Sequence, residues 1–272
     1  MTRLIDTLPE PEVIREKKVI VLSRSRVGTF SLYQAMKMLG YKPYHMWEVV
    51  NNGTIHMEIL EEALRCKFLD GGKPYGKAEF DKWLAAYDSV IEIPQFFVDE
   101  FIEFYPDAQF ILMERKMESW TRSLEATINP LLKSLRSFPF IVARKIDKFM
   151  DRFCSLHFVL DDVWFHGKGS DNGMDDAVRD VLRDNKKAKA VIPKERLLVV
   201  KLEDGFGWEQ ICPFLGHDIP STPYPRGNAP AEFAQLGKQI LGPGIRKVAA
   251  LAVSVVLVPV VGVGAWYFFK DR

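Results

Sequence analysis

The sequence predicts an α/β protein, a three-layer sandwich with a central parallel sheet, followed by a C-terminal hydrophobic helix. Short apolar, β-branched runs alternate with longer segments of helical period, which is typical of parallel strands joined by helices. A last apolar run, residues 248–269, carries no charged side chain. The chain has 272 residues, of which 47% are hydrophobic, so it can bury a substantial core.

Four nearly continuous apolar runs are typical of strands that a parallel sheet buries on both faces. They lie at 18–22, 89–93, 108–114 and 196–202. Helices are predicted between and after them at 31–39, 55–67, 97–104 and 118–128. The less regular region 129–176 predicts a helical insertion with a mobile loop.

The hydropathy pattern divides the chain into three parts. Residues 1–235 form the predicted α/β domain, 236–247 a linker, and 248–269 a transmembrane tail anchor. The uncharged run is long enough to cross a hydrocarbon core of ~30 Å as a helix. Its proline and two glycines are tolerated in membrane helices and unfavourable in soluble ones. The alternative is a buried helix, or a tail that covers an apolar groove of its own domain.

Charge and the N-terminal residues bear on partners and location. The formal net charge of +1 gives no reason to expect nucleic acid as the main partner, so any anion site must be local. The N-terminus lacks the apolar segment of a secretory signal. We therefore expect a single-pass C-terminal membrane anchor with the domain facing the cytosol. The oligomeric state stays open.

The loop after the first predicted strand, SRSRVGTFS, is a candidate anion site. Ligands of open α/β sheets bind beyond the carboxyl ends of the strands. Gly28 allows close backbone approach, Thr29 and Ser31 supply hydroxyls, and the start of the next helix presents free N–H groups. Arg24 and Arg26 add positive charge. A phosphate group is the expected ligand, and an ordinary strand-to-helix turn with surface arginines is the alternative.

The same loop argues against nucleoside triphosphate hydrolysis. A Walker-type loop, GxxxxGK[ST], needs a lysine for the phosphates and a hydroxyl for magnesium. Here Thr29 stands at the lysine position and Phe30 at the hydroxyl position. We therefore expect a reaction that requires no metal.

Residues 25–46, SRVGTFSLYQAMKMLGYKPYHM, resemble the 5′-phosphosulfate loop of the P-loop sulfotransferases, above all the fungal-type branch with a loop like P-R-T-G-T-x-S-L. That family has a P-loop-like fold and uses 3′-phosphoadenylyl sulfate (PAPS). The resemblance implies that Arg26 stabilises charge on the bridging oxygen during sulfuryl transfer. The implied cofactor contacts of the loop are Arg24, Arg26, Val27, Gly28, Thr29, Phe30 and Ser31.

A second motif agrees with this resemblance. The family binds the 3′-phosphate with an arginine at a strand end and a serine eight residues later. The stretch LMERKMESWTRSL supplies Arg115 and Ser123 at that spacing. A serine two helical turns after the arginine can face back toward it.

The resemblance also nominates Glu92, in SVIEIPQFF, as general base on the acceptor hydroxyl. A carboxylate at a sheet edge under an apolar lid is expected to have a raised pKa, as a base near neutral pH needs. The alternative is a structural cap that accepts N–H bonds from the turn at Pro94. His45, in YKPYHMWEV, either reaches the acceptor pocket or packs beside its aromatic neighbours.

The resemblance extends over residues 15–230, with gaps in the insertion. Near its end, the family's G-W-x-x-L-C-x-F-L-G and P-x-x-x-F-P-x-x-N patterns match in order at Trp208, Cys212, Phe214, Leu215, Gly216, Pro220, Pro225 and Asn228. Ser23 and Ser25 depart from the family's loop, where a glycine and a proline are usual.

The sequence therefore predicts a sulfotransferase that moves a sulfuryl group from PAPS to a hydroxyl of a small, apolar acceptor such as a secondary metabolite. Phe96, Phe97 and Trp47 are the expected apolar lining. Two alternatives stay open. One is an enzyme of the same fold with a changed reaction in a biosynthetic pathway, and the other is a non-catalytic, membrane-anchored nucleotide-binding scaffold.

Overall fold

A five-stranded parallel sheet forms the centre of the molecule, in the order β2-β3-β1-β4-β5. The computed structural model describes residues 2–69, 71–227 and 230–270, and for 230–232 and 255–270 the backbone alone. The strands are β1 (Val19–Val21), β2 (Pro43–Tyr44), β3 (Ser89–Ile91), β4 (Gln109–Glu114) and β5 (Leu197–Lys201). The predicted α/β class and its four strands are confirmed. The structure also contains the short strand β2, which the sequence does not predict.

Helices cover both faces of this sheet. Every residue of β1 and β3 is buried. Because successive side chains of a strand point to opposite faces, this burial requires a layer of helices on each side. Strand β1 lies in the middle, where Val19 pairs with Ser89 on one side and Gln109 on the other. At the edge, β5 leaves Val199 38% exposed.

Most predicted helices are present with small shifts at their ends. The helices before β4 are α1 (Leu4–Thr7), α2 (Thr29–Met38), α3 (Met46–Asn51), α4 (Thr54–Phe68), α5 (Lys77–Trp83), the 3-10 turn η1 (Ile93–Phe96) and α6 (Val98–Phe104). After β4 follow α7 (Met117–Ala126), α8 (Ile128–Leu135), α9 (Phe140–Ile146), α10 (Lys148–Trp164), α11 (Met174–Val191), η2 (Lys194–Arg196), η3 (Leu202–Asp204), α12 (Trp208–Leu215) and α13 (Pro230–Lys270).

The predicted insertion consists of three helices, α8 to α10, followed by turns before α11. The Asp147 side chain accepts the backbone N–H of Met150 at 2.9 Å, which caps the start of α10. Helix α10 packs along α4. The insertion is therefore part of the main body.

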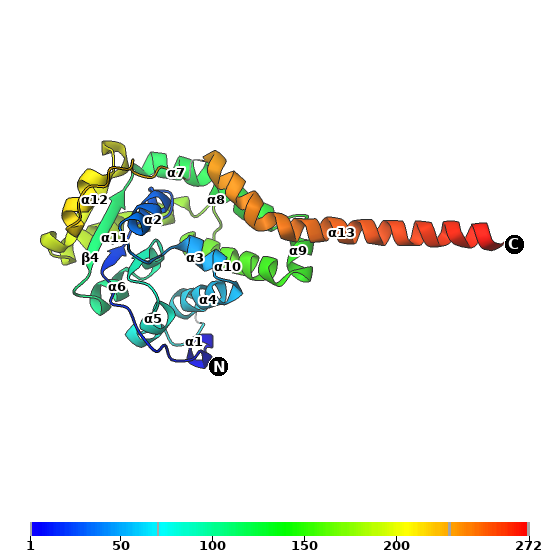
Figure 1. Cartoon of the computed structure of the whole chain (residues 1–272), viewed down its shortest axis with the longest axis horizontal. Helices are drawn as coiled ribbons and strands as arrows, with labels where there is room; N and C mark the ends of the chain where they lie inside the picture. Colours follow the sequence, from blue (N-terminus) through cyan, green and yellow to red (C-terminus); the bar gives the residue numbers. More distant parts are fainter. Residues whose placement is uncertain (1, 70, 228–229, 271–272) are drawn as a thin grey trace.

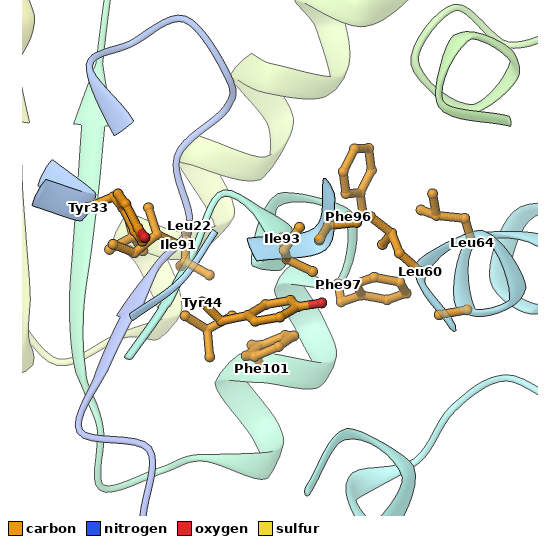
Figure 2. Close-up of a cluster of buried hydrophobic side chains, with 14 of the residues drawn as sticks. Leu22, Tyr33, Tyr44, Leu60, Leu64, Ile91, Ile93, Phe96, Phe97 and Phe101 are labelled. Atoms are coloured by element: carbon orange, nitrogen blue, oxygen red, sulfur yellow. The ribbon is translucent and has the colours of Figure 1, made fainter. Parts of the chain in front are cut away.

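An aromatic cluster holds the chain that follows β3. Phe96 of η1 and Phe97, the residue after it, lie beside Leu60 and Leu64 of α4, with Phe101 of α6 close by (Figure 2). The rings of Phe97 and Phe80 are 5.1 Å apart. This packing fixes the backbone just beyond the carboxyl end of β3, where Glu92 lies.

Helix α13 is continuous from Pro230 to Lys270, so the predicted linker 236–247 is helical (Figure 1). It packs against α9 and α10, and its far end projects beyond the body of the molecule. A Cβ added at Gly244 would lie 2.3 Å from Cγ of Met150 on α10. The glycine therefore serves a close helix contact there.

The predicted membrane span belongs to the far end of α13. Within the part of the chain that the structure describes, no helix has both the length and the apolarity needed to cross a membrane. Most of the run 248–269 lies beyond residue 254, outside the described side chains. The span is not confirmed.

We expect Gly28→Ala to lower the free energy of unfolding by about 2 kcal/mol, because Gly28 has a φ of 96° and an added Cβ would lie 3.0 Å from Met113. Gly40→Ala is the matched control. Its φ is 87°, but nothing lies within 4 Å of the added Cβ, so a loss of about 1 kcal/mol is expected. Urea unfolding followed by tryptophan fluorescence measures both. Equal losses would contradict the close packing at Gly28.

Candidate active site

Hydrogen bonds tie the loop between β1 and α2 to β4 and α7. The Leu22 N–H donates to the Ile111 carbonyl at 3.0 Å. The Met113 N–H donates to Ser23 Oγ at 2.7 Å, and Trp120 Nε1 donates to the Ser25 carbonyl at 2.9 Å. The serine that replaces the family's glycine at position 23 therefore links the loop to β4. These bonds fix the loop before any ligand binds.

The two predicted phosphate motifs meet at this loop. Arg26 Nε donates to Ser123 Oγ of α7 at 3.3 Å. Arg115, directly after β4, donates from Nη1 to the Arg26 carbonyl at 2.7 Å. Arg26 itself has a φ of 70°, a conformation that is uncommon for a residue other than glycine. The sheet thus brings together residues that lie far apart in the sequence.

The electrostatics of this cluster suit an anion. Burial lowers the pKa of the Arg26 guanidinium below its ordinary value. The negative charge of Glu92 raises this pKa, and the positive charge of Arg115 lowers it further. Burial also lowers the pKa of Arg115. A doubly charged phosphate near both arginines would offset these costs. The residues present therefore fit a ligand that carries phosphate groups.

Other predicted loop residues are placed at the start of α2. Gly28 is its N-cap, and Thr29 is its first residue. The Val27 and Thr29 side chains are buried. Val27 can therefore offer a ligand only its backbone N–H, and Thr29 its backbone N–H and its hydroxyl. The Phe30 ring lines the cavity beside Glu92. Their contacts to a cofactor stay predictions.

Two predicted residues are engaged by other parts of the protein. The Ser31 hydroxyl accepts the backbone N–H of Gly227 at 3.1 Å. Arg24 forms an ion pair with Asp184 of α11 at 2.6 Å and lines a second cavity. Their predicted cofactor contacts are also untested.

Glu92 is a buried carboxylate held on both oxygens. It directly follows β3 with a φ of 72°, and it is 5% exposed. The Ser25 hydroxyl donates to Oε1, and His45 Nε2 lies 2.6 Å from Oε2. Its side chain caps no N–H of the turn at Pro94. The structural-cap alternative is therefore wrong.

His45 follows β2 as Glu92 follows the adjacent strand β3. The backbone N–H of Trp47 donates to His45 Nδ1 at 3.0 Å. The proton of the neutral ring is therefore assigned to Nε2, the nitrogen that faces Glu92. His45 lines the cavity and contacts the predicted base, which agrees with the first of its two alternatives, that it reaches the acceptor pocket. The sequence gives no clear signal for this position, because the strand before it has only two residues.

The pKa of Glu92 shifts opposite to the expected direction. Burial alone would raise it, but His45, the Ser25 hydroxyl and the charge of Arg26 outweigh burial and lower the pKa below its ordinary value. The expectation of a raised pKa is therefore wrong, because it counted the apolar surroundings and not these three partners. Glu92 is ionised at neutral pH.

A cavity of about 710 Å³ opens beside this carboxylate. Ser25, Arg26, His45 and Glu92 lie together in its lining, and we call this group the polar end of the cavity. Apolar and aromatic side chains form most of the remaining lining, among them Trp47, Phe96, Ile128, Leu131, Phe153 and Trp164. Phe97, also expected in the lining, instead packs in the core.

Helix α13 forms one wall of this cavity, which the sequence analysis missed. Phe233, Leu236, Ile240 and Ile245 contribute apolar surface. The Phe233 ring centre lies 5.1 Å from the Arg26 guanidinium carbon. These apolar residues are spaced as in a helix, but the glycines and the proline that lie between them in the sequence favour a linker.

Comparison with known proteins identifies the family. A family model described as a sulfotransferase domain matches residues 18–233. The chain therefore belongs to the sulfotransferase domain family and is a sulfotransferase-like transferase. This confirms the resemblance seen in the loop.

A curated relative and a solved structure add to this finding. The Ava biosynthesis cluster protein M of Aspergillus versicolor is 35% identical over 216 residues, which cover 76% of this chain and 79% of the relative. The crystal structure of a sulfotransferase from Alicyclobacillus acidocaldarius aligns over 88% of this chain and 96% of its own, with 14% identity and a TM-score of 0.39. A similarity that low carries no argument about the site.

Among the residues open to description, no group of three His, Cys, Asp or Glu side chains is placed to hold a metal ion. The expectation of a metal-free reaction stays a prediction.

We expect His45→Phe to raise the pKa of Glu92, because burial then acts with fewer opposing partners. Carboxyl ¹³C NMR titration measures this pKa directly, with the resonance assigned by Glu92→Gln. His157→Phe is the control, since His157 lines the same cavity but bonds to the Phe153 carbonyl. An unchanged Glu92 titration in His45→Phe would contradict the assigned contact.

Proposed function

We propose that this protein transfers a sulfuryl group from PAPS to a hydroxyl of an apolar acceptor. One observation carries the proposal. The phosphate motifs of two separate chain segments meet at Arg26, directly beside a buried carboxylate at the polar end of an apolar cavity. A phosphate-bearing donor and an apolar acceptor can therefore lie on either side of Arg26.

The donor would supply an activated sulfuryl group. Arg115 and Ser123 would bind its 3′-phosphate, and the backbone N–H groups at the start of α2 would bind its 5′-phosphate. Arg26, between these groups and Glu92, would stabilise the negative charge that develops on the leaving phosphate. The buried Arg26 and the partly buried Arg115 support this assignment, because a bound anion offsets their mutual repulsion.

The acceptor would occupy the cavity. Its volume of about 710 Å³ suits a small organic molecule, and its lining favours an apolar one. Glu92 would receive the proton of the acceptor hydroxyl, since it is ionised at neutral pH. The relative from a biosynthesis cluster supports a secondary metabolite as acceptor.

The location at a membrane is part of the proposal. The run 248–269 contains no charge, and the far end of α13 projects beyond the body (Figure 1). We infer that this end anchors the protein in a membrane with the domain facing the cytosol.

We expect the protein to bind adenosine 3′,5′-bisphosphate more tightly than ATP, and Arg115→Ala to weaken that binding by about tenfold or more, since a charge-assisted hydrogen bond is lost. Isothermal titration calorimetry measures both affinities. Arg65→Ala is the control, because Arg65 lies on α4 and pairs with Glu61. Turnover is then measured by transfer of labelled sulfur from PAPS to a panel of phenols and aliphatic alcohols.

The outcomes separate the proposal from its alternatives. Bisphosphate binding without any transfer would favour a nucleotide-binding scaffold. Conversion of an acceptor without PAPS would favour an enzyme with a changed reaction. Absence of bisphosphate binding in the wild type would contradict the donor site itself.

We expect the full chain to sediment with phosphatidylcholine vesicles and a chain ending at Ser254 to stay in the supernatant, since only the former contains the whole apolar run. The shorter chain keeps Leu241, Gly244 and Val248, which pack against the body. Its unchanged binding of the bisphosphate is the control for folding. Equal sedimentation of both chains would contradict the anchor.

A further inference from the structure

We propose that the Ser25 hydroxyl relays the acceptor's proton to Glu92, so that Ser25 is a catalytic residue that touches the acceptor. This inference rests on the proposed sulfuryl transfer. It assigns a role to a residue that stands where the family's loop usually has a proline.

The first argument is access. Glu92 is 5% exposed and His45 is 6% exposed, whereas Ser25 is only partly buried. All three residues line the polar end of the cavity. Each Glu92 oxygen already has a neighbour, Ser25 at Oε1 and His45 at Oε2. An acceptor hydroxyl in the cavity therefore meets the Ser25 oxygen more readily than the carboxylate.

The second argument is the direction of the hydrogen bonds. An ionised carboxylate can only accept, so the Ser25 proton must point to Glu92 Oε1. This leaves lone pairs of Ser25 Oγ to accept a hydrogen bond from the acceptor's O–H. The hydroxyl thus has the polarity that a relay toward Glu92 needs.

The third argument is the role of His45. Its Nδ1 accepts the Trp47 N–H, so its Nε2 carries a proton in both charge states of the ring. His45 Nε2 lies 2.6 Å from Glu92 Oε2 and, because it already carries a proton, cannot remove one from the carboxyl group. It is a positioning residue that holds one oxygen and leaves Oε1 to Ser25.

The step balances without a further reactant. The acceptor oxygen forms the new bond to sulfur while its proton passes to Ser25 Oγ, and the Ser25 proton passes to Glu92 Oε1. The bond between sulfur and the bridging oxygen breaks, and its electron pair stays on the leaving phosphate. Glu92 becomes neutral, Ser25 is regenerated, and Glu92 later releases its proton to solvent.

The backbone around Ser25 is fixed, as a relay requires. Trp120 Nε1 donates to the Ser25 carbonyl at 2.9 Å. The Glu92 carbonyl accepts from Gln95 Nε2 at 2.7 Å. Both partners of the proton transfer are thus held by groups outside the transfer path.

The test is single-turnover transfer from PAPS in wild type, Ser25→Ala and Ser25→Thr, each in mixtures of H₂O and D₂O. We expect Ser25→Ala to reduce the rate about 100-fold with unchanged affinity for adenosine 3′,5′-bisphosphate, and Ser25→Thr to restore most of it. A plot of the wild-type rate against the deuterium fraction of the solvent should be curved, because two protons move in the step. The same plot for Ser25→Ala should be a straight line, because only one proton then moves.

Ser134→Ala is the matched control. Ser134 lines the same cavity, but its hydroxyl bonds to the Pro130 carbonyl. An unreduced rate in Ser25→Ala, or a straight line for the wild type, would overturn the relay and leave sulfuryl transfer intact. Failure of the wild type to transfer sulfur to any acceptor would instead overturn the proposed function.

Discussion

The ionised carboxylate of Glu92 is the constraint on which the site depends. A buried charge is costly unless charged or hydrogen-bonding partners surround it. Here three partners come from two chain segments: Ser25 and Arg26 from the loop after β1, and His45 from the end of β2. The loop, the sheet edge and the polar end of the cavity are therefore held in one arrangement by a single side chain.

The order of the strands explains why these groups meet. In a parallel sheet all carboxyl ends lie at one edge, and neighbouring strands are about 4.8 Å apart. β1 lies between β3 and β4, so its loop reaches Glu92 after β3 and Arg115 after β4. The buried cluster that includes Ile91 of β3, Phe97 and Phe101 keeps that edge in place.

The sequence predicts the strands, most helices and the three motifs, because each has a local signal. It does not predict β2, whose two residues are too few for a pattern. The pKa of Glu92 is set by partners that lie far from it in the sequence, such as His45. The apolar residues next to Glu92 in the sequence would predict a raised pKa, whereas these partners lower it. The sequence does not predict that residues 236–247 are helical, because Gly244 interrupts the helical pattern while serving a close contact with Met150.

The cavity wall formed by α13 has a consequence for divergence within the family. The family match ends at residue 233, whereas Leu236, Ile240 and Ile245 of the wall lie beyond it. Part of the cavity wall is thus encoded outside the segment that the family model matches. Substitutions at these three positions would therefore reshape the cavity while leaving Arg26, Glu92 and the loop after β1 unchanged.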